Sequence, residues 1–200
     1  MRTPIHYLNV VDIEATCWEG NPPAGQYSEI IEVGIVVMDL SIRNQQRNRK
    51  QNNGKLSTIR ITDKKSFLIK PVASEVSRYC TELTTITPEM LVEADTFANV
   101  CEHLKSDYDS KNRSWASFGN YDHHIFKTES ERKEVEYPFS DKHINIKHIF
   151  ATLRGEKEVG MSKALSKIGE ELEGTHHRGH DDAYNTAKIW KYILSNFAGY

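Results

Sequence analysis

The sequence contains no long apolar run and few cysteines, and these absences exclude several classes of protein. No stretch reaches the eighteen apolar residues of a transmembrane helix. The first residues lack a basic-then-apolar leader with a small-residue cleavage site, so we do not expect secretion. The 3 cysteines (Cys17, Cys80 and Cys101) form no CxxC pair and cannot all pair with one another. We therefore expect reduced thiols in a cytoplasmic protein without a membrane span.

Composition and charge are those of a folded globule. The 200 residues, 38% of them hydrophobic, suit a single domain over 1–200, and no internal repeat is visible. The formal net charge is only −2, but residues 41–70 carry nine bases and one acid, whereas residues 71–110 carry eight acids and two bases. This asymmetry is compatible with a polyanion lying over part of the surface. A solvated polar loop explains the basic stretch equally well.

Hydrophobic periodicity predicts a mixed α/β fold. Apolar, β-branched runs predict strands at 7–14, 29–40 and 57–71, with a flexible basic hairpin insertion at about 41–58. The next segment, 84–108, is predicted to be helical, with a cap at Thr87 and a restart at Asp95–Thr96. The remaining predicted elements are a strand at 113–120, a helix at 125–135, a strand-to-helix segment at 142–150 and helices at 161–172 and 181–194. This order indicates a three-strand antiparallel meander continued by parallel strands and covered by helices.

The first motif with chemical content is VVDIEAT. Side chains at i and i+2 of a strand share a side, so Asp12 and Glu14 project together. Neighbouring carboxylates on an apolar strand are costly unless something neutralises them, and Mg²⁺ prefers oxygen ligands. For so short a motif, a strand end whose acids reach solvent is the commoner explanation.

Two further stretches place acids at the ends of elements. In SWASFGNYD, Asp122 lies between a strand and a helix, where open α/β sheets collect ligands; alternatively it is a helix N-cap. In HHRGHDDAYNT, Asp181 and Asp182 precede an amphipathic helix, and Asp181 is most simply its cap. Together with the DxE pair, Asp122 and Asp182 would balance two Mg²⁺ ions in charge. His177, five residues before Asp182, would be the base, since imidazole titrates near neutral pH.

These motifs resemble the DEDDh (DnaQ-like) 3′→5′ exonucleases, whose fold is RNase H-like. The match comprises Asp12 and Glu14, Asp122 after a strand and turn, and His177 followed five residues later by Asp182. The sister DEDDy group has tyrosine where this chain has Arg178. DIEATCWEGNPP, EIIEVG and HHRGHDDAYNTAKI are similar to the subgroup of histone-mRNA 3′ exonuclease-like and KapD-like proteins, over roughly residues 7–195.

The resemblance implies a role for each residue. Asp12 would bridge two Mg²⁺ ions (or Mn²⁺), Glu14 and Asp182 would complete one site, Asp122 would hold the second ion, and His177 would deprotonate the attacking water. The implied activity is 3′→5′ exonucleolytic hydrolysis of single-stranded nucleic acid with a free 3′ end, RNA favoured over DNA.

Substrate contacts are also implied. The main chain of Ala15 and Thr16 would cradle the terminal nucleotide, and Tyr121 would pack on its base. An ordinary core tyrosine is an equally good interpretation of Tyr121.

Two other functions compete with the nuclease. A non-catalytic regulator would use the same fold to bind a partner protein, since fold does not dictate function. A zinc module would use His176, His177 and His180, but no cysteine lies nearby in sequence to complete it. In the nuclease interpretation, His176 and His180 are bystanders.

Overall fold

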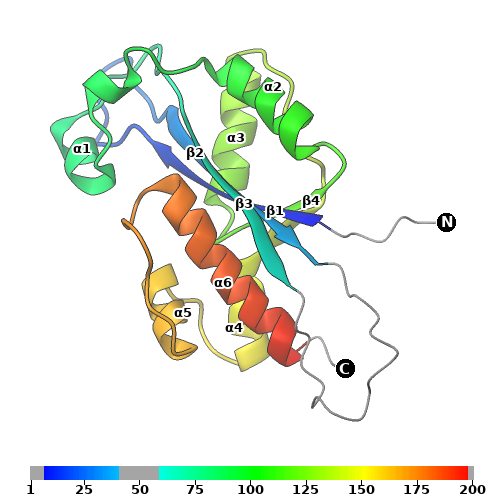
Figure 1. Cartoon of the computed structure of the whole chain (residues 1–200). Helices are drawn as coiled ribbons and strands as arrows, with labels where there is room; N and C mark the ends of the chain where they lie inside the picture. The colour runs from blue at the N-terminus through cyan, green and yellow to red at the C-terminus, as the bar shows by residue number, and fades with distance from the viewer. Residues whose placement is uncertain (1–6, 41–58, 198–200) are drawn as a thin grey trace, which may run out of the picture.

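A five-stranded mixed sheet lies between two layers of helices in the computed structural model, which describes residues 7–40 and 59–197 (Figure 1). The strands are β1 (Tyr7–Ala15), β2 (Ile30–Asp39), β3 (Arg60–Leu68), β4 (Ser114–Ser117) and β5 (His143–Asn145), in the order β3-β2-β1-β4-β5. β1 to β3 form an antiparallel meander, while β4 and β5 continue the sheet in parallel with β1. The predicted fold class is confirmed. The predicted insertion at 41–58 lies outside the described residues.

The helices are α1 (Arg78–Thr84), the 3₁₀ turn η1 (Pro88–Leu91), α2 (Phe97–Tyr108), α3 (Tyr121–Arg132), α4 (Ile146–Arg154), α5 (Met161–Lys167) and α6 (Gly179–Phe197). α2 and α3 cover one face of the sheet and α4 to α6 the other (Figure 1). None of the helices in the described part of the chain has the length and apolar character of a membrane span.

Alternation along β1 assigns its side chains to these two layers. Val11 and Ile13 pack with the residues of α2 and α3, whereas Leu8 and Val10 pack with those of α4 to α6. Since the period of a strand is two, the acids that follow Val10 at even positions belong to the α6 face. The strand is buried on both sides because it is central in the sheet.

Several predicted helix boundaries are wrong for local reasons. Thr87 makes no side-chain cap bond, and the turn after it is 3₁₀. The predicted restart is confirmed, because the Thr96 side chain accepts from the Asn99 amide and caps α2. The sequence analysis missed α1, which Ser77 caps through the Cys80 amide. α5 ends at Lys167, short of the predicted end, and Gly169 follows with a left-handed φ of 74°.

Candidate active site

Three carboxylates meet where the carboxyl end of β1 passes the start of α6. Asp12 and Glu14 lie on the α6 side of β1, and Asp182 lies in the first turn of α6. One oxygen from each of these three groups lies within 4.8 Å of the other two. Glu14 is 8% exposed and Asp182 3% exposed, so these charges are shielded from water. The prediction that the DxE acids reach solvent is therefore wrong for Glu14.

The fourth acid, Asp122, follows β4, the strand that pairs with β1 on the side away from β2. β4 ends at Ser117, Gly119 turns the chain with a φ of 130°, and α3 begins at Tyr121. The Asp122 Oδ1 accepts a hydrogen bond of 3.1 Å from the amide of Ile13, the residue between the two β1 acids. Asp122 is not the helix N-cap, because Asn120 holds that position. Its carboxylate is instead bound directly to the acidic segment of β1.

Two glycines allow α6 to approach the sheet closely enough to deliver Asp182. Gly34 of β2 is the register partner of Asp12. A Cβ built on Gly34 would lie 1.9 Å from the carbonyl carbon of Gly179, at the start of α6. A Cβ on Gly179 would meet the Asp12 carbonyl oxygen at 3.0 Å. The backbones are therefore in direct contact beside the acids, and only residues without a Cβ fit there.

Burial and mutual repulsion shift the titration of this cluster. Burial, followed by the charge of Asp122 and then of Glu14, raises the pKa of Asp12 well above its ordinary value. Burial and the charge of Asp182 raise the pKa of Glu14 to about 8. Burial also raises the pKa of Asp122 to about 6 and that of Asp182 above its usual value. A set of hard oxygen donors whose pKa values are raised by burial and mutual repulsion fits a divalent cation, because the cation favours their ionised form.

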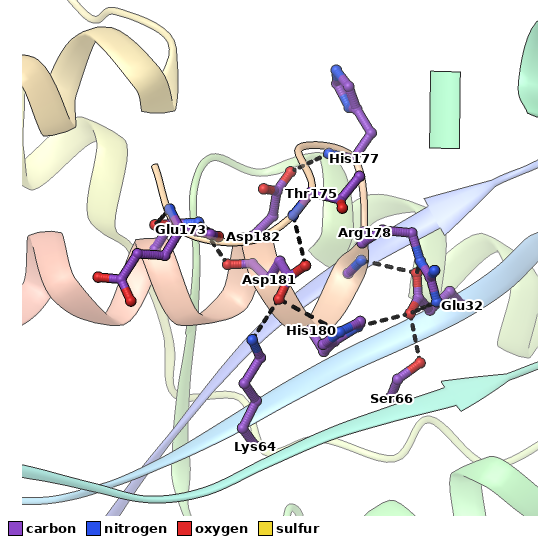
Figure 2. A network of polar contacts seen from close by, with 12 residues as sticks. Glu32, Lys64, Ser66, Glu173, Thr175, His177, Arg178, His180, Asp181 and Asp182 are labelled. Carbon is purple, nitrogen blue, oxygen red and sulfur yellow. Dashed lines mark hydrogen bonds and ion pairs between the residues drawn. The ribbon is translucent and has the colours of Figure 1, made fainter. Parts of the chain in front are cut away.

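His177 lies beside the acids on the loop that precedes α6. Its backbone is left-handed, with a φ of 63°, and its amide donates to the Asp182 Oδ2 at 3.0 Å. Its ring stacks on the His176 ring at 4.0 Å between centroids and points away from Asp181 and Glu32 (Figure 2). Burial and the neighbouring His176 lower the pKa of His177. A neutral imidazole at neutral pH is able to accept a proton.

The other residues of this loop are engaged, which corrects three predictions. Asp181 is not a helix cap: α6 begins before it, and its carboxylate accepts from the Thr175 amide at 2.8 Å and pairs with Lys64 of β3. His176 is no bystander, because its Nδ1 lies 2.9 Å from the Asp182 Oδ2. His180 is none either, because its Nδ1 lies 3.1 Å from the Glu32 Oε1. The three histidines of the zinc-module hypothesis therefore do not converge on one site, because the His180 ring contacts Glu32.

Glu32 is a residue of this region that the sequence analysis missed. It is fully buried in β2 and accepts from the Arg178 Nε at 3.1 Å, the Arg178 Nη2 at 3.2 Å, the Gly179 amide at 2.9 Å and the Ser66 hydroxyl at 2.5 Å (Figure 2). Burial alone would raise the pKa of Glu32, but these donors outweigh burial and hold it below its usual value. A glutamate inside the apolar run EIIEVG was the available signal.

The predicted substrate contacts differ in their exposure to solvent. Tyr121 is 57% exposed, so its interpretation as a core tyrosine is wrong. Thr16 is fully buried, its amide donates to the Glu29 carbonyl at 2.9 Å, and its hydroxyl donates to the Tyr27 carbonyl at 3.1 Å. The Ala15 carbonyl accepts from the Cys80 thiol at 3.6 Å. The Thr16 donors are thus already used within the fold.

The chain is similar in sequence and in fold to known nucleases. The chain is 28% identical to human 3′-5′ exoribonuclease 1 over 92% of its own length and 51% of the relative, and 24% identical to probable 3′-5′ exonuclease KapD of Bacillus subtilis over 93% and 83%. It thus spans about half the length of the human relative. The structure superposes with a TM-score of 0.81 on the nuclease domain of 3′hExo, a DEDDh family member bound to rAMP, at 25% identity over 98% of this chain and 96% of that one.

These similarities confirm the predicted resemblance to DEDDh nucleases. The RNase T family model, described as exonuclease, matches residues 10–190. That span includes Asp12, Glu14, Asp122, His177 and Asp182. With the fold and the acid cluster, it shows that this chain belongs to the exonuclease family.

Proposed function

We propose that this chain is a metal-dependent 3′→5′ exonuclease that hydrolyses single-stranded nucleic acid from a free 3′ end. The observation that carries the proposal is the meeting of Asp12, Glu14 and Asp182, with Asp122 bonded to the same strand. These acids come from three separate segments of the chain and are largely withdrawn from water. Burying several carboxylates together lowers the stability of the folded chain, so their convergence supports a functional role and not a structural one.

The proposed cofactor is a pair of Mg²⁺ ions, replaceable by Mn²⁺. Asp12 would contact both ions, Glu14 and Asp182 would complete one site, and Asp122 would hold the other. Bound ions of this kind acidify the attacking water and stabilise charge on the leaving oxygen. The raised pKa values of the acids support cation binding, because cations favour the ionised carboxylates.

In this proposal His177 accepts the proton of the attacking water. Its lowered pKa keeps the imidazole neutral, and its amide bond to Asp182 keeps the residue beside the acids. Tyr121, exposed next to Asp122, would stack on the terminal base, and the main chain at Ala15 would face the terminal nucleotide. Thr16, which is fully buried, would hold this segment in place through its bonds to Tyr27 and Glu29.

RNA is the proposed substrate class. The human relative is named an exoribonuclease, and the superposed nuclease domain is bound to rAMP.

The 3 cysteines are unpaired, which supports a reducing, cytoplasmic setting. We further propose that residues 1–200 form one exonuclease domain.

The test is digestion of a 5′-labelled single strand with Mg²⁺. We expect progressive shortening from the 3′ end, abolished by EDTA and by Asp12→Asn, with matched RNA and DNA strands compared side by side. Cuts in a circular strand would indicate an endonuclease instead. Stoichiometric binding of a partner protein, with no turnover of any 3′ end, would favour a non-catalytic regulator.

A further inference from the structure

A second group of potential metal ligands shares Asp182 with the acid cluster. One nitrogen each of His176 and His177 and one oxygen of Asp182 lie within 4.8 Å of one another. We propose that these three side chains bind a borderline transition-metal ion such as Zn²⁺, and that its binding inhibits the nuclease by occupying His177. The inhibitory consequence rests on the proposed function, whereas binding of the ion does not.

The contact between His176 and Asp182 is close to the separation that a shared ion requires. The His176 Nδ1 lies 2.9 Å from one carboxylate oxygen of Asp182 and 3.2 Å from the other. Zn–N and Zn–O bonds of about 2.1 Å at tetrahedral angles place two donor atoms about 3.4 Å apart. For His176 and Asp182 an ion therefore needs a movement of only a few tenths of an ångström, and the His177 nitrogen, within 4.8 Å of both ligand atoms, moves inward to complete the set.

The loop conformation brings the second imidazole to the same place. Consecutive side chains on an extended strand point to opposite sides. His177 has a left-handed backbone instead, and its ring lies stacked on the His176 ring with 18° between the ring planes. The bond from the His177 amide to the Asp182 Oδ2 holds this turn against α6. His176 has a side-chain exposure of 43%, so ions reach the group from solvent.

Ligand chemistry separates this group from the acid cluster. Two imidazoles, one carboxylate and a water are a donor set for Zn²⁺ or Co²⁺, whereas Mg²⁺ favours the all-oxygen set of Asp12, Glu14 and Asp182. His180 is not part of the group, because its Nδ1 lies 3.1 Å from the Glu32 Oε1 and its Nε2 lies 3.5 Å from the Asp181 Oδ1. An imidazole that coordinates an ion has no lone pair left for a proton, so His177 would stop acting as a base.

The first experiment measures metal binding without any substrate. Zn²⁺ is titrated calorimetrically into the full chain in excess Mg²⁺, and Co²⁺ is titrated with detection of its visible absorption bands. We expect one ion per chain and a loss of affinity of at least about tenfold in His176→Ala. His103→Ala is the matched control, because His103 lies on α2, across the sheet, and contacts Asp107. Equal affinity in wild type and His176→Ala overturns the proposal.

The second experiment measures inhibition as the ratio of rates with and without Zn²⁺ in constant Mg²⁺. Half-inhibition of His176→Ala should need at least about tenfold more Zn²⁺ than wild type or His103→Ala. If all three proteins digest RNA and are inhibited alike, Zn²⁺ acts at the acids and the inference fails while the proposed function stands. If Zn²⁺ binds through His176 but neither the wild type nor either variant digests a 3′ end, the proposed function fails and the metal site stands.

Discussion

Gly34 of β2 and Gly179 of α6 are in backbone contact, with no room for a Cβ on Gly34, since that atom would lie 1.9 Å from the Gly179 carbonyl carbon. Gly34 is paired with Asp12 and Gly179 lies three residues before Asp182. The contact therefore sets the distance between the acids of β1 and the acid of α6. Any side chain added there pushes α6 away from the sheet.

Gly34→Ala should damage the site and the fold together. We expect a loss of about 1–3 kcal/mol in the free energy of unfolding from overpacking, and a loss of activity beyond what the unfolded fraction explains. Denaturant melts and digestion rates measure the two effects. Gly160→Ala is the control, because a Cβ at Gly160 meets nothing within 4 Å. A fully active Gly34→Ala would contradict the importance of this contact.

Glu32→Gln should loosen the loop that carries His177. The substitution leaves the Arg178 guanidinium without its buried counter-ion, so we expect about 3–5 kcal/mol of destabilisation. Because the pKa of Glu32 is lowered, its stabilising contribution is present above the ordinary glutamate range and is lost as pH falls through the lowered value. The difference in unfolding free energy between the two proteins should therefore shrink in acid.

A matched control for Glu32→Gln is Glu82→Gln. Glu82 pairs with Arg78 at 2.6 Å, but their side chains are 58% and 92% exposed. An exposed pair contributes little, so the change in stability should stay within about 1 kcal/mol. Equal effects of the two substitutions would show that the Glu32 contacts do not hold the loop.

His177→Ala should lose turnover by roughly 10²–10⁴-fold while Mg²⁺ binding persists, if His177 is the general base. Its lowered pKa places the rise of kcat/KM with pH below the ordinary histidine range of about 6.5, since the base must be neutral. The measurement is a pH profile of single-strand digestion. His103→Ala should keep the wild-type profile. Full activity in His177→Ala would remove His177 from the mechanism.

Mg²⁺ should stabilise the protein more at pH 8 than at pH 5.5. The pKa of Glu14 is raised to about 8 in the folded state, so the folded chain holds a proton that the unfolded chain loses above its ordinary range. Without metal, this group therefore costs stability progressively as pH rises towards 8. A bound cation removes that cost, and each kcal/mol restored corresponds to about 2–4 °C in Tm.

Thermal melts with Mg²⁺ or EDTA at the two pH values measure this effect. Asp12→Asn is expected to reduce the response to Mg²⁺ at both. The prediction fails if the shift in Tm is the same at pH 5.5 and pH 8.

Tyr121→Ala should weaken substrate binding without unfolding the protein, because the side chain is 57% exposed. Loss of stacking of about 1–3 kcal/mol per base corresponds to a rise in KM of about fivefold or more. Tyr121→Phe keeps the ring and should behave as wild type. Identical KM values for Ala and Phe would exclude base stacking at this position.

Local rules were sufficient to predict part of this site. Alternation along a strand puts Asp12 and Glu14 on one side wherever the strand lies, and the predicted strands at 7–14 and 29–40 agree with β1 and β2. The spacing of His177 and Asp182 is likewise a property of one short segment. Capping chemistry predicted the restart of helix at Thr96 but not the cap at Ser77.

Contacts between distant segments were beyond those rules. The bond from the Ile13 amide to Asp122 joins residues 109 positions apart, and that from Arg178 to Glu32 joins residues 146 apart. No period or motif encodes which donor a buried acid will meet, because that depends on how close two elements pack. The glycine contact between β2 and α6 sets that closeness here.

Sequence patterns alone therefore predicted most of the order of elements and the strand face of the DxE acids, since these follow from local periodicity, and the motifs built on the acids and His177 carried the family resemblance. Tertiary packing decided that Asp181 pairs with Lys64, that His180 turns to Glu32, and that His176 joins His177 beside Asp182. Each histidine and aspartate of HHRGHDD has similar local chemistry. Their different roles arise because the loop before α6 and the first turn of α6 present successive side chains to different neighbours, on the sheet for His180 and Asp181 and on α6 itself for His176.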